Sequence, residues 1–150
     1  MRKFQYRLER ILELKKYHEQ EWELKLAEIS EQCLKLENEI KKREEQKSTA
    51  FLKTGSSSVG FSVYDLSARD YYVQRLESEI RQLNDELAQK QKKQEEVRQK
   101  YSEAAKERKV LDKLREKKAE EYYRESLKEE MKEIDDLTVS AQSRRRSEKY

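Results

Sequence analysis

The sequence predicts an all-α fold: an antiparallel two-helix coiled-coil hairpin with the second helix longer than the first. The chain has 150 residues, no proline and only two glycines, so almost nothing in it breaks a helix. Both glycines, Gly55 and Gly60, fall in one Ser-rich stretch, residues 54–62. Charged residues make up 45% of the chain while the net charge is only +3, a balance typical of coiled coils rather than of disorder. We therefore expect a single hairpin domain over residues 1–150.

The first helix is expected over residues 4–53. Its inward-facing positions recur in alternating steps of four and three, the period of a coiled coil. These spine positions are Phe4, Leu8, Ile11, Lys15, His18, Trp22, Leu26, Ile29, Cys33, Leu36 and Ile40. Between Trp22 and Leu26 one four-residue step follows another, which predicts a stutter, a local unwinding of the supercoil. His18 and Cys33 lie on this spine, so we expect both to pack rather than to react.

Short local signals define the turn and the second helix. Gly55 suits the left-handed residue that ends many helices. Ser62 and Asp65 have the spacing of a capping box, in which both side chains bond to free N–H groups at a helix start. The second helix is expected over residues 63–140, followed by a frayed basic tail, residues 141–150. Its spine keeps strict four–three steps through Leu76, Ile80, Leu83, Leu87, Lys90, Gln94, Val97, Tyr101, Ala104, Arg108, Leu111, Arg115, Lys118 and Tyr122.

The two spines also predict how the helices face each other. If the chain turns at Ser58, residues that face each other have numbers that add up to about 116. Ile40 then faces Leu76, and Phe4 faces about Asp112. About 25–30 residues of the second helix, roughly 40 Å at 1.5 Å per residue, would be left without a partner helix.

The residue inventory excludes most catalytic chemistry. One histidine and one cysteine are too few for a multi-histidine metal site and make a Ser-His-Asp or Cys-His site implausible. Two glycines in a Ser-rich turn do not form a phosphate-binding loop. We therefore expect no enzyme, no cofactor and no metal. No apolar run approaches the ~20 residues that span a bilayer, and no signal-peptide pattern follows the first residues, so a cytosolic protein is expected.

Charge is unevenly distributed along the chain. Residues 1–10 carry a net charge of +3 and residues 106–118 one of +4, and the hairpin brings these segments together as a basic collar. Residues 119–137 carry a net charge of −5. The basic collar could contact phosphates or an acidic protein surface, or be only a solvated face. Tyr6 and Tyr123 fit two interpretations equally, filling of the helix seam or anchoring of a partner.

Two motifs mark the ends of the predicted hairpin. The first helix opens with Phe4-x-Tyr6-Arg7-Leu8-Glu9-Arg10-Ile11-Leu12-Glu13-Leu14-Lys15. Late in the second helix stand Leu111-Asp112-Lys113-Leu114-Arg115-Glu116-Lys117-Lys118, then Glu121-Tyr122-Tyr123-Arg124 and Glu133-Ile134-Asp135-Asp136-Leu137. These motifs resemble the FliJ family, the soluble coiled-coil component of the flagellar type III export apparatus. The chain length, the single loop and the longer second helix agree with that resemblance.

The resemblance implies a fold similar to the stalk (gamma) subunit of rotary ATPases and a place in the central channel of the hexameric flagellar export ATPase. The protein would promote ring assembly and ATP hydrolysis without hydrolysing ATP itself. It would also bind the cytoplasmic part of the export gate, and some members are expected to assist export chaperones. No nucleic acid and no direct membrane insertion are expected. The implied location is cytoplasmic, peripherally associated with the flagellar basal body at the inner membrane.

The resemblance also assigns candidate contacts. The residues expected to face the ATPase ring are Phe4, Arg7, Leu8, Ile11, Leu111, Leu114, Arg115, Lys118 and Tyr122. No family motif marks the gate contact; the residues expected to bind the export gate, chosen by their place on the half of the second helix nearer the loop, are Tyr72, Leu76 and Leu83. A six-fold ring cannot be tightly complementary to one asymmetric hairpin, so polar spine residues such as Arg108 suit the ring contact. Replacing Arg115 and Lys118 by Glu should abolish ATPase stimulation and leave helicity intact.

Three other interpretations stay open. A self-associating coiled-coil scaffold predicts a stable dimer through residues 119–137. The stalk protein of a virulence-type secretion system would share the fold. A nucleic-acid-binding hairpin would use the basic collar and Arg144–Arg146, and it predicts steeply salt-dependent binding. The acidic residues mixed into residues 106–118 disfavour this last interpretation.

Overall fold

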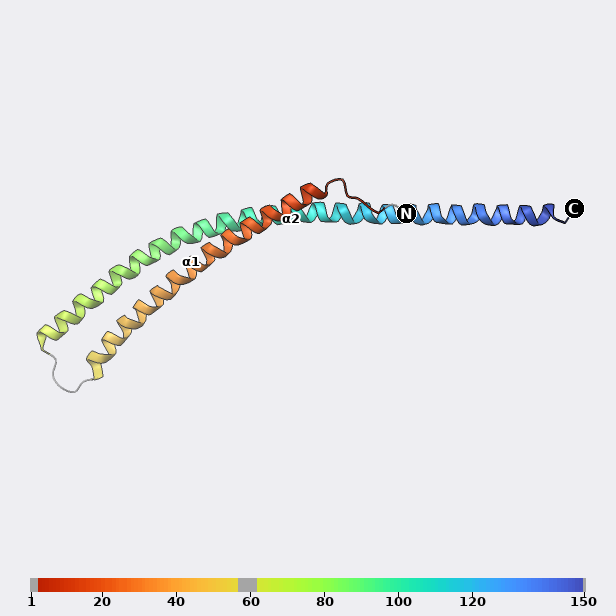
Figure 1. The fold of residues 1–150 in the computed structure, drawn as a ribbon. Helices are drawn as coiled ribbons and strands as arrows, with labels where there is room; N and C mark the ends of the chain where they lie inside the picture. The colour runs from red at the N-terminus through yellow and green to blue at the C-terminus, as the bar shows by residue number, and fades with distance from the viewer. Residues whose placement is uncertain (1–2, 57–61, 150) are drawn as a thin grey trace. The chain divides into compact units, whose positions relative to one another are not determined.

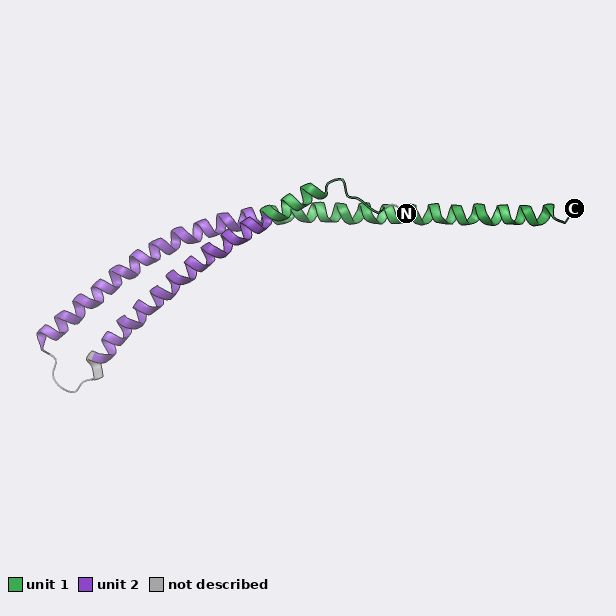
Figure 2. Cartoon of the chain, in the orientation of Figure 1, with its two compact units in different colours: residues 1–18, 104–150 green, residues 19–103 purple. Residues whose placement is uncertain are grey.

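The computed structural model describes residues 3–56 and 62–149, and it has two α-helices that pack against each other as a hairpin (Figure 1). Helix α1 spans Glu9–Ser56 and helix α2 spans Val63–Ser147, so the all-α hairpin with a longer second helix is confirmed. The chain divides into two compact units (Figure 2). Unit 1 comprises residues 1–18 and 104–150, and unit 2 comprises residues 19–103. Within the described ranges no helix is long and apolar enough to cross a membrane.

The start of α2 is the predicted capping box. The backbone N–H of Asp65 donates to Ser62 Oγ at 3.3 Å, and the backbone N–H of Ser62 donates to Asp65 Oδ2 at 3.2 Å. These two bonds satisfy N–H groups that have no partner inside the first turn of a helix. The negative charge of Asp65 also lies at the positive end of the helix dipole, so local sequence alone explains why α2 begins here.

Three predicted helix ends are wrong. Helix α1 begins at Glu9 rather than at residue 4, because the preceding residues lie extended on α2, as described below. It continues through Gly55 to Ser56, so Gly55 is not a left-handed cap, and no described glycine has a positive φ. Helix α2 ends at Ser147 rather than near residue 140, because no breaker interrupts it and three arginines in its last turn favour the negative end of the dipole. Ser58 and Gly60 lie outside the described residues.

The spine of α1 is regular, and the predicted stutter is wrong. Leu12 is fully buried, with 0% of its surface exposed, whereas Ile11 is 45% exposed. Glu19 is half-buried and His18 is exposed. With Leu12 and Glu19 as spine positions, steps of four and three alternate along the helix. The sequence pattern failed here because Ile11 and Leu12 are adjacent aliphatic residues. Starting the alternation at Ile11 keeps Lys15 on the spine but places the position after it on His18 instead of Glu19.

The other spine predictions agree with the burial of side chains, except at His18 and at two positions late in α2, Arg115 and Lys118, which are exposed. Cys33 is buried at 5% exposure, so its predicted packing role is confirmed. The packing role predicted for His18 is wrong, because its ring lies at the exposed surface beside Tyr17, with ring centroids 6.2 Å apart. In α2 every predicted spine position from Leu76 to Leu111 is buried or half-buried.

The helices face each other one heptad away from the predicted register. Cross-helix contacts of unit 2 include Arg43 with Glu79 at 3.0 Å, Lys47 with Glu77 at 2.9 Å, Ser30 with Gln94 at 3.0 Å, and Lys100 over Trp22 at 5.0 Å from the ring centroid. The residue numbers of these four pairs add up to 122 or 124, and those of Arg69 over Phe51, nearer the loop, add up to 120, whereas 116 was predicted. The difference is close to seven, and a shift of seven returns every spine position to another spine position. Periodicity therefore could not distinguish the two registers.

Two of these contacts lower the pKa of a glutamate. The hydrogen bond and the positive charge of Lys47 hold the pKa of Glu77 below its ordinary value of 4.5. The hydrogen bond from Arg43 does the same for Glu79, which Arg75 also approaches at 3.3 Å. The ion pairs that cross the hairpin thus favour the charged forms of both carboxyl groups.

Candidate partner-binding surface

The surface begins with the N-terminal segment, residues 3–8, which precedes α1. Burial alternates along it: Phe4, Tyr6 and Leu8 are half-buried, while the residues between them are exposed. Alternation with a period of two fits an extended chain with one face packed over residues 3–6, and residues 7–8 then turn into α1, where the backbone N–H of Glu9 donates to the carbonyl of Tyr6 at 3.2 Å. An extended chain rises about 3.3 Å per residue, compared with 1.5 Å in a helix, so this segment reaches further along α2 than a helix would.

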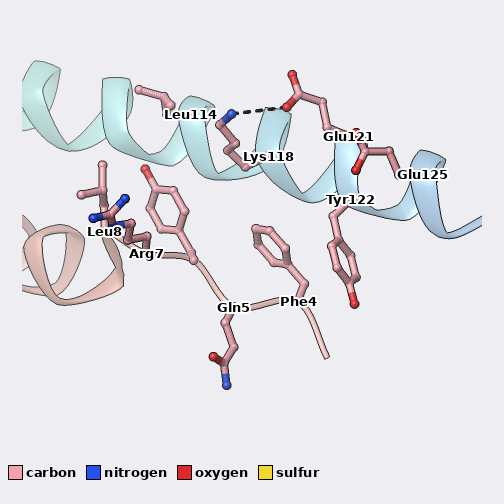
Figure 3. Close-up of a pocket in the computed structure, with 10 residues that line it drawn as sticks. Phe4, Gln5, Arg7, Leu8, Leu114, Lys118, Glu121, Tyr122 and Glu125 are labelled. Carbon is pink, nitrogen blue, oxygen red and sulfur yellow. Dashed lines mark hydrogen bonds and ion pairs between the residues drawn. The ribbon is translucent and has the colours of Figure 1, made fainter. Parts of the chain in front are cut away.

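Aromatic contacts hold this segment on α2. The Phe4 ring lies 5.6 Å from the Tyr122 ring, centroid to centroid, with a tilt of 49° (Figure 3). The Tyr6 hydroxyl donates a hydrogen bond of 3.4 Å to the backbone carbonyl of Leu111. The ring of Tyr123 meets that of Tyr122 edge-on at 5.7 Å. Phe4 therefore reaches Tyr122 and not Asp112, which corrects the sequence-based expectation by ten residues.

A groove of about 800 Å³ opens between the N-terminal segment and α2 in unit 1. Its lining residues are Phe4, Gln5, Tyr6, Arg7, Leu8, Leu114, Lys118, Glu121, Tyr122 and Glu125 (Figure 3). A neighbouring hollow of about 410 Å³ is lined by Phe4, Gln5, Tyr6, Arg7, Glu9, Arg10 and Arg115. Of the nine residues expected to face the ring, these two hollows gather seven. Ile11 and Leu111 lie outside both.

The spine cations of the basic collar are paired within the chain. Arg115 Nε lies 3.2 Å from Glu9 Oε2. Lys118 Nζ lies 3.4 Å from Glu121 Oε2, the contact drawn as a dashed line in Figure 3. Arg108 forms an ion pair with Asp112 one turn away. These three side chains, which the sequence argument favoured for the ring, are therefore partly neutralised before any partner binds.

A row of lysines on α2 is available instead. Its members are Lys106, Lys109, Lys113 and Lys117, and all four are exposed. Their spacing of three, four and four places them along one side of the helix. Within the part of the chain that the structure describes, none of the four has an ion-pair partner. Sequence reasoning counted their charge in the basic collar but did not single them out, although their spacing alone could have done so.

The residues expected at the export gate differ in accessibility. Leu76 is 4% exposed and packs inside the hairpin, and Leu83 is half-buried. Tyr72 is 42% exposed and lines an open hollow of unit 2 together with Lys42, Glu45, Gln46, Thr49, Ala50 and Lys53. Sequence reasoning missed its neighbours in this end of the hairpin, Phe51 at 46% and Tyr71 at 74% exposure, because neither lies on a spine. Of the three expected residues, only Tyr72 has an exposed side chain that a partner could contact.

The described residues contain no group of three or more His, Cys, Asp and Glu side chains that could hold a metal ion.

The family model described as "Flagellar FliJ protein" matches residues 4–147. No curated protein and no solved structure matches the chain. The match spans the N-terminal segment, both helices and the long unpaired end of α2, so it covers all the surfaces described above.

Proposed function

This chain belongs to the FliJ family, a non-enzymatic component of the flagellar export apparatus, and on that premise we propose that it is the stalk that couples the export ATPase to the export gate. In this proposal unit 1 inserts into the hexameric flagellar export ATPase and promotes ring assembly and ATP hydrolysis. The loop-side end of the hairpin contacts the cytoplasmic part of the gate. The protein then acts on the cytoplasmic side, peripherally associated with the basal body, and export chaperones are a further partner class.

The observation that carries the proposal is the surface of unit 1. It combines the groove lined by Phe4 and Tyr122 with the lysine row on α2. Half-buried aromatic rings that line an open groove supply contact area at low entropic cost, and unpaired lysines supply charge for an acidic partner. Neither feature forms an enclosed pocket. Small molecules bind in enclosed pockets, whereas protein partners bind open surfaces such as this one.

A ring lumen suits this surface for a geometric reason. Six similar subunits face one asymmetric hairpin, so no fixed set of close contacts can satisfy all six. Lysine carries its charge on a long flexible stem, and it can therefore reach carboxylates at slightly different positions. We accordingly assign the main charge contact to Lys113 and Lys117, with Arg115 and Lys118 mainly holding the collar together.

The test is the ATPase rate and oligomeric state of the cognate export ATPase with and without this protein. Wild-type protein should accelerate hydrolysis and co-migrate with a ring-sized complex. The double variant Lys113→Glu/Lys117→Glu should require about tenfold more protein for the same stimulation, because two favourable exposed charge contacts become repulsive. Its helicity should be unchanged, since both side chains are exposed.

A matched control makes this result interpretable. The variant Lys92→Glu/Lys93→Glu changes the net charge equally but lies in unit 2, at exposed positions of the same helix. It should stimulate like wild type. Equal loss in both variants would reduce the effect to net charge, and no stimulation or co-migration by folded wild-type protein would reject the ring contact.

We place the contact with the export gate at the loop-side end of the hairpin. Tyr72 is its exposed residue, whereas Leu76 is buried in the hairpin and Leu83 is half-buried. Replacing Tyr72 by Ala should weaken binding to the isolated cytoplasmic part of the gate while ATPase stimulation persists. The control is Tyr17→Ala, which removes another exposed tyrosine ring, 57% exposed, from unit 1.

A further inference from the structure

The end of α2 carries an exposed apolar stripe that nothing in the hairpin covers. Its members are Tyr123, Leu127, Met131, Ile134 and Leu137, with exposed fractions of 59%, 56%, 64%, 59% and 68%. Steps of four, four, three and three place them along one side of the helix. Every residue from Met131 to Ser147 is exposed. We call these five residues the C-terminal stripe; such a contiguous apolar face on an isolated helix is typical of a docking surface.

The charges around the C-terminal stripe indicate what fits it. Residues 119–137 have a net charge of −5, in contrast to the basic segment directly before them. At 100° per residue, Glu133 borders one edge of the stripe, Glu130 stands within it on the side of Ile134 and Leu137, and Arg124 and Lys128 border the opposite edge. A partner must therefore bring apolar side chains together with a cation that meets these carboxylates, since an unpaired buried charge is costly.

A second copy of this chain is a poor match for the C-terminal stripe. In a parallel pair of identical helices each residue faces its own copy, so Glu130 would face Glu130 in the seam. In an antiparallel pair the same edge of each helix meets, which brings the two Glu133 edges together. Like charges in contact destabilise both arrangements. The charge pattern thus opposes the symmetric dimer that a purely apolar stripe would favour.

We propose that the C-terminal stripe binds a basic amphipathic helix of another protein. Leucine-like side chains of that helix pack on Leu127, Met131 and Ile134, and its lysine or arginine side chains meet Glu130 and Glu133. These contact residues, from Leu127 onward, lie beyond the stretch of α2 that lines the groove with the N-terminal segment, so the inference goes beyond the ring contact proposed above and does not depend on it.

The test uses two designed helical peptides of about three heptads, identical in their Leu positions and differing only in flanking residues, Lys in one and Glu in the other. Fluorescence anisotropy with the full-length protein should show at least about tenfold tighter binding of the Lys peptide. Raising the salt concentration should weaken that binding, since exposed charge contacts are screened. Equal binding of both peptides, or binding of neither, would overturn the proposal.

Variants locate the contact on the C-terminal stripe. Leu127→Gln/Ile134→Gln should weaken binding of the Lys peptide at least about tenfold without changing charge. The control Leu24→Gln/Leu34→Gln alters two leucines of unit 2 that are 67% and 56% exposed, and it should bind like wild type. If the control loses as much, the peptide is binding apolar surface indiscriminately and the assignment fails.

A charge-reversal variant tests the electrostatic part. Glu130→Lys/Glu133→Lys should bind the Glu peptide in preference to the Lys peptide. Sedimentation of the wild-type protein alone should show a monomer; a dimer abolished by Leu127→Gln/Ile134→Gln would replace this proposal by self-association. The Lys113→Glu/Lys117→Glu variant should keep its peptide binding, which separates failure here from failure of the ring contact.

Discussion

The register of the hairpin can be decided by one engineered disulfide. Cys33 is the single cysteine of the chain and is buried in the seam of unit 2. The contacts of Ser30 with Gln94 and of Arg43 with Glu79 place Cys33 opposite residue 90, whereas the sequence-based register places it opposite Leu83. The variant Lys90→Cys should therefore form an intramolecular disulfide on mild oxidation, and Leu83→Cys should not.

The expected magnitudes are large enough to separate the two variants. Positions 83 and 90 are seven residues apart, about 10 Å along a helix, and a disulfide requires Cα atoms closer than about 7 Å. The disulfide between positions 33 and 90 would close a loop of about 57 residues, which stabilises a protein by up to about 4 kcal/mol in the chain-entropy model. In a chain of this size that corresponds to a rise in melting temperature of roughly 10 °C.

Non-reducing gel mobility gives the crosslink yield, and thermal unfolding followed by circular dichroism, with and without reductant, gives the stabilisation. The Leu83→Cys variant serves as the control for an added spine thiol. Faster and stabilising crosslinking of Leu83→Cys would show that the hairpin is one heptad out of the register described above, and the reasoning from its ion pairs would fail.

Three further predictions follow from individual contacts. Leu12→Ala should lower the free energy of unfolding by about 2–3 kcal/mol and Ile11→Ala by less than about 1 kcal/mol, because Leu12 is fully buried and Ile11 is 45% exposed. Urea unfolding measures both losses, and equal losses would refute the corrected spine. The pKa values of Glu77 and Glu79 are lowered in the folded state, so their ion pairs stabilise the hairpin above pH 4.5 and that contribution is lost as the pH falls below it. Urea midpoints at about pH 6 and pH 3 should thus differ more for wild type than for Glu77→Gln/Glu79→Gln, and an identical difference would contradict the assignment. Phe4→Ala should release the N-terminal segment from Tyr122, a contact of about 0.5–1.5 kcal/mol, and amide exchange of residues 5–8 should accelerate while α1 and α2 keep their protection.

The fold itself could be predicted because its determinants are local. The absence of proline and the confinement of both glycines to one stretch dictate two long helices. The pairing of Ser62 and Asp65 fixes the start of α2 by two hydrogen bonds between neighbours in sequence. The register could not be predicted, because a seven-residue period does not determine which heptad of α1 faces which heptad of α2. Ion pairs such as Arg43 with Glu79 discriminate between the registers, but charged partners are abundant in every register of such a sequence.

The candidate surface was predicted less completely, for two physical reasons. The N-terminal segment was expected to be helical because its apolar residues Phe4, Leu8 and Ile11 fit a helical period. Phe4 and Leu8 also alternate with Tyr6 at a period of two, the pattern of an extended chain, and the Tyr6 hydroxyl donates a hydrogen bond to the carbonyl of Leu111 in the observed form. The helix boundary therefore depended on contacts with α2 that no local pattern contains.

The second reason concerns which charges are free to act. A sequence with 45% charged residues offers candidate contacts on every side of a helix, so net charge alone says little about binding. The structure separates two classes. Arg115 and Lys118 lie close to glutamates of the same unit. Lys113 stands two residues before Arg115, and Lys117 one residue before Lys118, and among the described residues neither has an ion-pair partner. A partner that binds the first class must first break ion pairs, and one that binds the second need not. In a coiled coil, charged side chains can bind a partner without breaking internal ion pairs only on the side of the helix where they have no such pairs. The lysine row lies on such a side of α2, and the acidic edge of the C-terminal stripe lies further along the same helix. One helix thus carries two surfaces that prefer partners of opposite charge.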